Sequence, residues 1–196
     1  VSPAPFVDDN FMKKIKSQII EPTLDGLKQE RIDYSGFMFF GLIKVNEEPF
    51  VIEYNVRLGD PETQAVIPRI QSDLLELLLR INSPKEFEKH ELQIRSEVTS
   101  TIIITSGGYP EKYQKGHLVS GLNKIKNSIP FHAGLKIKHN THITNGGRVL
   151  AITNLNNNLK DSLIQNYQDV AKIKFEKLYF RKDIGKDVIK LIFLKK

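Results

Sequence analysis

The residues from Phe50 to Arg57 combine an apolar run with three polar side chains at a spacing that could do chemistry. In a β-strand, successive side chains point to opposite faces, so residues two apart share a face. If this run is a strand, one face carries a carboxylate, an amide and a guanidinium, from Glu53, Asn55 and Arg57. Burying such a row against a core without partners would be costly, so this face should look into a polar cleft or at solvent.

Glu53 and Asn55 together offer hard oxygen ligands from one rigid strand, the ligand type that Mg²⁺ prefers where it also binds nucleotide phosphates. Arg57 beside them could hold a phosphate or a carboxylate through two hydrogen bonds. The alternative is an edge strand of a half-exposed hairpin whose polar face is wet, which is the common state of antiparallel sheets. The pattern alone favours this solvent-wetted face over a metal site.

Residues 57–63 form a second candidate feature, because a strand end, Gly59 and the start of a helix follow one another. Asp60 is a predicted N-cap, with Pro61 at the first helical position and Glu62 in the first turn. Backbone N–H groups at the start of a helix can receive an anion. An ordinary loop in which Asp60 caps the helix explains the same residues and, without other support, is favoured.

The elements that must position these residues can be read from hydrophobic spacing. An apolar stripe behind acidic capping residues predicts a helix over 9–30, with a bend at Pro22. Two β-rich runs, 36–45 and 50–56, predict a β-hairpin with a four-residue turn at 46–49. This hairpin would carry the candidate strand.

The rest of the chain follows the same signals. They predict short helices toward Ile70 and over 74–81, strands over 98–105, 135–138 and 148–153, a helix within 156–175 and a terminal strand over 188–196. Near residue 97 the sequence becomes rich in β-forming residues. We therefore predict an α+β fold in two domains, residues 1–96 and 97–196, the second being a small β-rich domain with one covering helix.

The composition excludes several classes of protein. The net charge is +6, but residues 1–100 carry −5 and residues 101–196 carry +11. The basic half could be a nucleic-acid surface, a pocket for phosphorylated ligands or a solvated lysine-rich face. The absence of cysteine excludes a disulfide framework, a thiolate zinc site and a cysteine nucleophile, and it fits the cytoplasm. No apolar run approaches the roughly 20 residues of a membrane helix.

Ordered motifs along the chain resemble those of one enzyme family. The strongest are Tyr34–Phe37, Gly41–Leu42 and the run Glu53–Gln64. Others occur in the family's order, at Ser2–Pro5, Ile20–Thr23, Ser72–Leu74, Gly107–Pro110, Phe131–Gly134, Thr144–Leu150 and Arg181–Gly185. Together they cover essentially the whole chain. The sequence therefore resembles the phosphoribosylamine–glycine ligases, which are ATP-grasp enzymes of purine biosynthesis.

The resemblance implies a ligase that uses ATP to join glycine to 5-phosphoribosylamine through glycyl phosphate. It implies that Glu53 and Asn55 are a metal-binding pair for Mg²⁺ or Mn²⁺, which reverses the preference from the pattern alone. Arg57 would be a catalytic residue that neutralises phosphate or the glycine carboxylate. The residues expected to bind substrate or phosphate are Arg57, Gly59, Asp60 and Glu62.

The resemblance also implies a complete enzyme more than twice as long as this chain, which opens at Val1 without an initiator Met. Residues 1–96 would then be the C-terminal part of an ATP-grasp domain, an antiparallel sheet with helices. The missing N-terminal lobe of the same enzyme would be its partner, and the truncated chain alone would be inactive. The alternative is a basic nucleic-acid-binding or interaction module without catalysis. Because the basic half lacks interleaved aromatic residues, nucleic acid is not an expected partner. A membrane is not an expected partner either, because no apolar run is long enough to span one.

Overall fold

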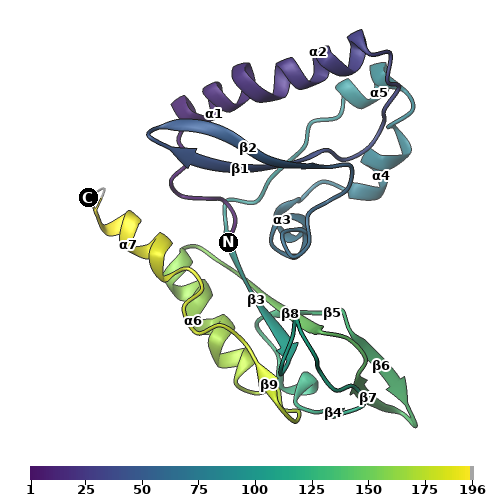
Figure 1. The fold of residues 1–196 in the computed structure, drawn as a ribbon, viewed down its shortest axis with the longest axis vertical. Coiled ribbons are helices and arrows are strands. Elements are labelled where there is room, and N and C mark those ends of the chain that lie inside the picture. The colour runs from purple at the N-terminus through teal and green to yellow at the C-terminus, as the bar shows by residue number, and fades with distance from the viewer. Residues whose placement is uncertain (195–196) are drawn as a thin grey trace. The chain divides into compact units, whose positions relative to one another are not determined.

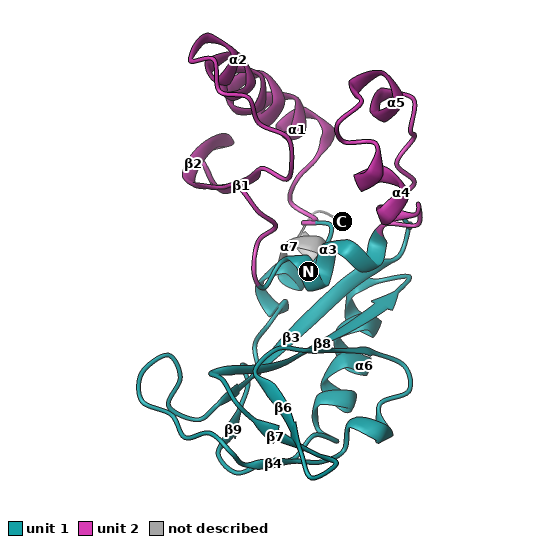
Figure 2. Cartoon of the chain, turned by 90° about the vertical axis from the view of Figure 1, so that its right-hand side faces the viewer, with its two compact units in different colours: residues 1–3, 61–69, 94–196 teal, residues 4–60, 70–93 magenta. Residues whose placement is uncertain are grey.

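The computed structural model describes residues 1–194, and it describes side chains as far as Lys190. By their internal contacts the residues form two compact units (Figure 2). The hairpin unit holds residues 4–60 and 70–93, and the sheet unit holds residues 1–3, 61–69 and 94–196. The division into domains at residues 96 and 97 stays a prediction, since the segment 61–69 lies before it in the sequence but belongs to the sheet unit.

The hairpin unit opens with a long helical run (Figure 1). Helix α1 (Asp9–Ile15) passes through a π-helical turn (Lys16–Ile20) into α2 (Glu21–Gln29). The side chain of Asp8 caps α1 by accepting a 2.8 Å hydrogen bond from the backbone N–H of Phe11. The π-helical turn lies just before Pro22, whose ring cannot donate a hydrogen bond and would clash with the carbonyl four residues earlier.

Strands β1 (Phe39–Val45) and β2 (Glu48–Asn55) form the predicted antiparallel hairpin. The predicted four-residue turn is wrong, because Glu48 and Pro49 already pair with β1. Only Asn46 and Glu47 form the turn, with φ angles of 48° and 63°. Positive φ at both central residues matches the right-handed twist of the flanking strands, which explains why the shorter turn is stable.

Short helices complete the first half of the chain. In the hairpin unit, α4 (Leu74–Leu79) begins at Asp73, whose carboxylate accepts hydrogen bonds from two backbone N–H groups, as predicted. Helix α5 (Pro84–Glu88) follows it. In the sheet unit, α3 (Thr63–Val66) continues as the 3₁₀ turn Ile67–Arg69, so the predicted helix toward Ile70 is present but shorter.

The sheet unit contains two antiparallel sheets, which confirms the α+β class. The four-stranded sheet has the order β5 (Ile129–His132), β8 (Arg148–Asn156), β3 (Val98–Ser106) and β9 (Leu178–Tyr179). The three-stranded sheet has the order β4 (Leu118–Val119), β7 (Thr141–Thr144) and β6 (Leu135–Lys138). The sequence predicted β3, β6 and β8 but not the other strands of this unit.

The core of the sheet unit lies between β3, β8 and helix α6 (Leu159–Val170) (Figure 1). Ile102, Ile104, Leu150 and Ile152 are fully buried there. Burying each such side chain contributes roughly 1.5–3 kcal/mol. The covering helix predicted within 156–175 is therefore confirmed.

Hydrogen bonds of buried polar side chains link α6 to the central strands. The Asn166 amide donates a 2.8 Å hydrogen bond to the backbone carbonyl of Ser100, and the hydroxyls of Ser100 and Ser162 are 2.8 Å apart. All three side chains are buried, so each bond also removes the cost of an unpaired polar group.

The chain ends in helix α7 (Lys186–Leu194), so the terminal strand predicted over 188–196 is wrong as far as residue 194. Val188 and Ile189 are consecutive, yet both pack against the core of the sheet unit. Successive side chains of a strand point to opposite faces, whereas neighbours on a helix can share one. The last two residues of the predicted strand lie outside the described residues.

Candidate functional site

Glu53 and Asn55 lie on one face of the hairpin. In the β1–β2 register, Glu53 is opposite Gly41 and Asn55 is opposite Phe39. Directly paired residues of an antiparallel ladder share a face, so this register places the carboxylate and the amide side by side. Their Cα atoms are two residues apart along the strand, a spacing of about 7 Å.

A β-bulge interrupts the hairpin beside Glu53. The register shifts between Gly41 and Leu42, because Leu42 pairs with Val51 and Ile52 has no partner. A bulge increases the local twist and re-aims side chains. The strict alternation that the sequence predicted along the whole strand is therefore interrupted at Ile52, and it resumes from Glu53 to Asn55.

Both candidate ligand side chains are accessible: Glu53 is exposed and Asn55 is half-buried. Within residues 1–194, neither makes a side-chain hydrogen bond or an ion pair, so their oxygens are free to bind a cation. The described residues contain no group of three or more His or acidic side chains that could hold a metal. The pair thus fits a Mg²⁺ or Mn²⁺ ion that takes its remaining ligands from water and substrate phosphates.

Arg57 does not share this strand, because β2 ends at Asn55. Its exposed guanidinium donates a 3.1 Å hydrogen bond from Nη1 to the backbone carbonyl of Leu58. The predicted row of three polar residues on one strand is therefore reduced to two. Arg57 follows them in the loop, where its guanidinium keeps further donors for a ligand.

The remaining predicted site residues divide between the two units. Gly59 is buried and Asp60 is exposed in the hairpin unit, whereas Glu62 is exposed in the sheet unit. Helix α3 begins only at Thr63, after Glu62 at the cap position. The grouping of Glu62 with Arg57 in one pocket stays a prediction.

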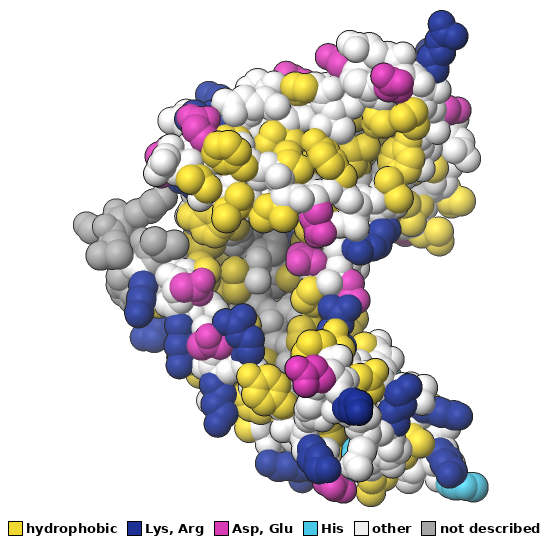
Figure 3. Space-filling model, viewed as in Figure 1, with side chains coloured by type: hydrophobic (Ala, Val, Ile, Leu, Met, Phe, Trp, Pro, Cys, Tyr) yellow, Lys and Arg dark blue, Asp and Glu magenta, His cyan; other side chains and the backbone are white. Residues whose placement is uncertain are grey.

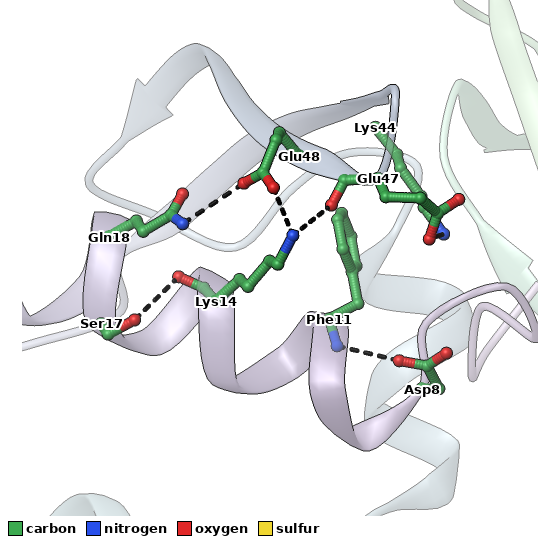
Figure 4. Close-up of polar contacts among 8 residues, drawn as sticks. All are labelled: Asp8, Phe11, Lys14, Ser17, Gln18, Lys44, Glu47 and Glu48. Atoms are coloured by element: carbon green, nitrogen blue, oxygen red, sulfur yellow. Dashed lines mark hydrogen bonds and ion pairs between the residues drawn. The ribbon is translucent and has the colours of Figure 1, made fainter.

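The turn end of the hairpin contacts the N-terminal helix (Figure 4). Lys14 forms an ion pair with Glu48 and donates a 3.0 Å hydrogen bond to the backbone carbonyl of Glu47. The hydrogen bond and charge of Lys14, with a hydrogen bond from Gln18, lower the pKa of Glu48. The Lys44 ammonium lies 4.8 Å from the centre of the Phe11 ring.

Further along the same helix, the hydroxyl of Thr23 lies 3.3 Å from that of Tyr54. Lys44 and Tyr54 each neighbour a residue of the Glu53 face, so they point to the other side of the hairpin. The helix therefore supports the strand from behind and leaves Glu53 and Asn55 uncovered by it.

The hairpin also exposes large apolar side chains. Ile52 and Val56 keep 66% and 70% of their surface exposed, and Ile43 and Phe50 are about half exposed. Figure 3 shows hydrophobic side chains gathered over the hairpin unit, whereas Lys and Arg side chains spread over the sheet unit. An exposed apolar patch of this kind marks an interaction surface in a natural protein.

The sheet unit contains a cavity of about 500 Å³. Its walls are mainly apolar, from residues such as Ile103, Tyr109 and Ile184, and its two charged side chains are Glu62 and Arg181. Such a cavity, mostly apolar with a few polar groups, is a typical binding site for a small molecule. Except for Glu62, the lining residues have no role that the sequence alone predicts, although Tyr109 and Arg181 lie in motifs that resemble those of the family.

Local contacts hold the cavity wall in place. Arg181 donates two hydrogen bonds, of 3.0 and 2.8 Å, to the carboxylate of Asp183, and this guanidinium lowers the pKa of that carboxyl. The hydroxyl of Tyr167 donates to the carbonyl of Arg181 at 3.0 Å and accepts from the N–H of Ile184 at 3.1 Å. Burial raises the pKa of Tyr167, which keeps this hydroxyl protonated as a donor.

Two sequence models of one enzyme match this chain. Residues 1–63 match the phosphoribosylglycinamide synthetase ATP-grasp (A) domain, and residues 99–187 match the phosphoribosylglycinamide synthetase C domain. The first match contains the Glu53–Asn55 face, and the second contains the cavity residues from Thr101 to Ile184. The chain belongs to the phosphoribosylamine–glycine ligase family.

Relatives of known sequence and structure agree with this family. The phosphoribosylamine–glycine ligase of Fusobacterium nucleatum is 38% identical over 94% of this chain, which covers 44% of that protein. The trifunctional purine biosynthetic protein adenosine-3 of Gallus gallus is 37% identical over 94% of the chain, or 18% of its own length. The crystal structure of the Thermotoga maritima phosphoribosylamine–glycine ligase matches with a TM-score of 0.79 and 27% identity, over 90% of this chain and 44% of that one.

This chain therefore spans less than half the length of the curated ligases that it matches. Nothing in the fold or among the relatives favours the alternative of a nucleic-acid-binding or interaction module. Among the described residues, no helix has the length and apolarity to cross a bilayer.

Proposed function

We propose that this chain is part of a phosphoribosylamine–glycine ligase, which uses ATP to join glycine to 5-phosphoribosylamine. In this reaction the glycine carboxylate attacks the terminal phosphorus of ATP, and ADP leaves. The amine of phosphoribosylamine then attacks the carbonyl of glycyl phosphate, and inorganic phosphate leaves as the amide forms. The family membership supports the reaction, and the purine-biosynthetic names of the relatives support the cytoplasmic location expected from the sequence.

Glu53 and Asn55 are the proposed ligands of Mg²⁺ or Mn²⁺. The observation that carries this assignment is a carboxylate and an amide on one face of a strand, neither with a side-chain partner among the described residues, in a chain of this family. When bound with ATP, the ion would neutralise the phosphate charge that develops during transfer. The protein's own contribution is to hold both oxygens on a rigid hairpin that the N-terminal helix supports from behind.

Arg57 is proposed to neutralise a phosphate or the glycine carboxylate during transfer. Its guanidinium is exposed and has one intramolecular hydrogen bond, so it can still present a pair of donors to an oxyanion. Gly59, Asp60 and Glu62 are proposed to complete substrate binding. The loop that carries them connects the metal-binding strand to the wall of the cavity.

The cavity of the sheet unit is the proposed site for the phosphorylated sugar amine. Arg181 offers a cation for the phosphate, and Glu62 offers an acceptor for hydroxyl or amine groups. In the complete enzyme, Arg181→Gln should raise the KM for phosphoribosylamine by roughly 10–100-fold, the effect of losing one charge-assisted hydrogen bond. The KM for ATP should stay unchanged. An unaltered KM for phosphoribosylamine would contradict this assignment.

The remainder of the enzyme is the proposed partner of this chain. The relatives contain more than half of their length outside the matched region, and the hairpin exposes apolar side chains that a folded protein normally covers. We infer that this remainder supplies the other nucleotide-binding residues and packs on the hairpin.

The proposed reaction is tested by omitting substrates one at a time from the complete enzyme. ADP formation should require ATP, glycine and a divalent ion, and release of the amide product should require phosphoribosylamine as well. ADP formation that does not depend on glycine would contradict a glycine ligase. A product formed with another amino acid in preference to glycine would contradict the substrate assignment.

A further inference from the structure

Gly41 lies directly across the hairpin from Glu53. A Cβ atom on Gly41 would be 2.6 Å from Cγ of Glu53 and 3.5 Å from its Oε1. The Glu53 side chain therefore occupies the space that any other residue at position 41 would fill. This contact fixes where the carboxylate lies on the face of the hairpin.

The backbone does not explain why a glycine stands at this position. Gly41 is absent from the glycines with positive φ, so an alanine could adopt its conformation. Glycine in a strand also lowers the free energy of unfolding, by roughly 0.5–1 kcal/mol relative to alanine. Close approach of the Glu53 side chain is the remaining physical reason for it.

The surroundings of Glu53 provide no other restraint of equal strength. Its carboxylate has no hydrogen bond or ion pair within residues 1–194. The bulge at Ile52 adds twist immediately before it, and Asn55 follows on the same face. The rotamer of Glu53 thus depends on the open space above Gly41.

We propose that Gly41 is a positioning residue for the metal-binding pair, an inference that rests on the proposed function of Glu53 and Asn55. By leaving space over β1, it lets the Glu53 side chain lie along the hairpin and hold its carboxylate in the orientation used with the Asn55 amide. A methyl group at position 41 forces Glu53 into another rotamer. Divalent ion affinity then falls while the backbone of the hairpin is retained.

The test follows Mn²⁺ binding by NMR, with Mn²⁺ alone as the probe. In the ¹⁵N-labelled chain, Mn²⁺ should broaden the side-chain amide signals of Asn55. In Gly41→Ala, the same broadening should require about tenfold more Mn²⁺, a loss typical of residues that orient metal ligands. Glu53→Gln should abolish it. Without metal, Gly41 Hα should show an Overhauser contact to the Glu53 Hγ protons, because the Glu53 side chain occupies the space where a Cβ of residue 41 would lie.

Gly26→Ala is the matched control. Gly26 belongs to the same unit, and a Cβ there would meet nothing within 4 Å. This variant should bind Mn²⁺ as the unaltered chain does, and its helix should gain up to about 1 kcal/mol. The amide spectrum and melting temperature of Gly41→Ala should show that its hairpin remains folded.

Two outcomes separate this inference from the proposed function. If Mn²⁺ does not broaden Asn55 in the unaltered chain, the metal assignment fails and the role of Gly41 fails with it. If it does, but Gly41→Ala has the same Mn²⁺ dependence as the unaltered chain, only the positioning role is refuted.

Discussion

The carboxylates of this chain differ in whether other protein groups bind them through hydrogen bonds or ion pairs. Glu48 is bound by Lys14 and Gln18, and Asp169 by Lys172, whereas Glu53 has no protein partner within residues 1–194. The bound carboxylates have lowered pKa values and serve the fold. A carboxylate left free beside a free amide is instead available to a ligand. This contrast supports the assignment of Glu53 to function.

Asp169 should make the stability of the sheet unit pH-dependent. Burial raises the pKa of its carboxyl, but hydrogen bonds from Lys172, Ser128 and Gln165 outweigh burial and lower it. A folded pKa below the unfolded value of about 3.9 gives stability that is complete well above pH 4. This stability is lost as the pH falls through the lowered pKa.

The measurement is urea unfolding of Asp169→Asn and the unaltered chain between pH 7 and pH 2. At pH 7 the variant should be less stable by roughly 1–3 kcal/mol, and the difference should shrink toward acid pH. Glu111→Gln, an exposed carboxylate of the same unit, is the control and should leave the profile unchanged. A stability difference that does not vary with pH would count against the ionised Asp169.

At the scale of elements, long periodic segments could be predicted and short ones could not. The apolar stripes before and after Pro22, and those of α6, identify helices because several turns repeat the pattern. Strand β4 has only two residues, and β5 contains Pro130, so neither carries a periodic signal. These two strands form because they pair with β7 and β8, which lie elsewhere in the sequence. The local sequence does not indicate such long-range hydrogen bonds.

The two candidate sites differ in the same way. Glu53 and Asn55 are two residues apart, so strand alternation was sufficient to place them on one face. The cavity draws its lining from segments as distant as Pro61, Thr101 and Arg181, so only the fold brings them together. Arg57 was misplaced because the strand ends at Asn55, two residues before it.

The packing of Tyr109, a residue of the cavity wall, can be tested by substituting Gly147. A Cβ atom on Gly147, just before β8, would lie 2.0 Å from Cδ2 of Tyr109, so the aromatic ring packs against the glycine backbone. Gly147→Ala should therefore displace Tyr109 and reduce the free energy of unfolding by roughly 1–3 kcal/mol. In a Tyr109→Ala background, the same substitution should cost much less. Equal effects in both backgrounds, measured by thermal unfolding, would contradict this packing.

At the scale of the whole molecule, the charge asymmetry of the sequence follows the family organisation. The segment that matches the ATP-grasp domain holds the candidate metal pair, and the basic half contains all but the first two residues of the segment that matches the C domain. Basic side chains on the sheet unit suit an enzyme whose proposed substrates carry phosphate, because they raise the local concentration of anions. The charge therefore does not require a nucleic-acid partner.

The chain by itself should have no ligase activity. It spans 44% of the length of the Fusobacterium nucleatum enzyme, and the proposed nucleotide site requires residues from the remainder. Purified residues 1–196 should give no glycine-dependent ADP formation above background in a coupled assay. The complete enzyme, assayed at the same molar concentration, is the positive control. Glycine-dependent turnover by the short chain would show that the site is complete without that remainder.

The central claim is that Glu53 holds the divalent ion of a glycine-dependent ligase, and steady-state kinetics of the complete enzyme test it most directly. Glu53→Gln keeps the size of the side chain but removes the carboxylate charge. If the claim is right, glycine-dependent ADP formation should fall by about 1,000-fold, which corresponds to about 4 kcal/mol of transition-state stabilisation. Thermal stability should stay unchanged, because Glu53 has no protein partner within the described residues. A kcat near that of the unaltered enzyme at ordinary Mg²⁺ concentration would contradict the claim.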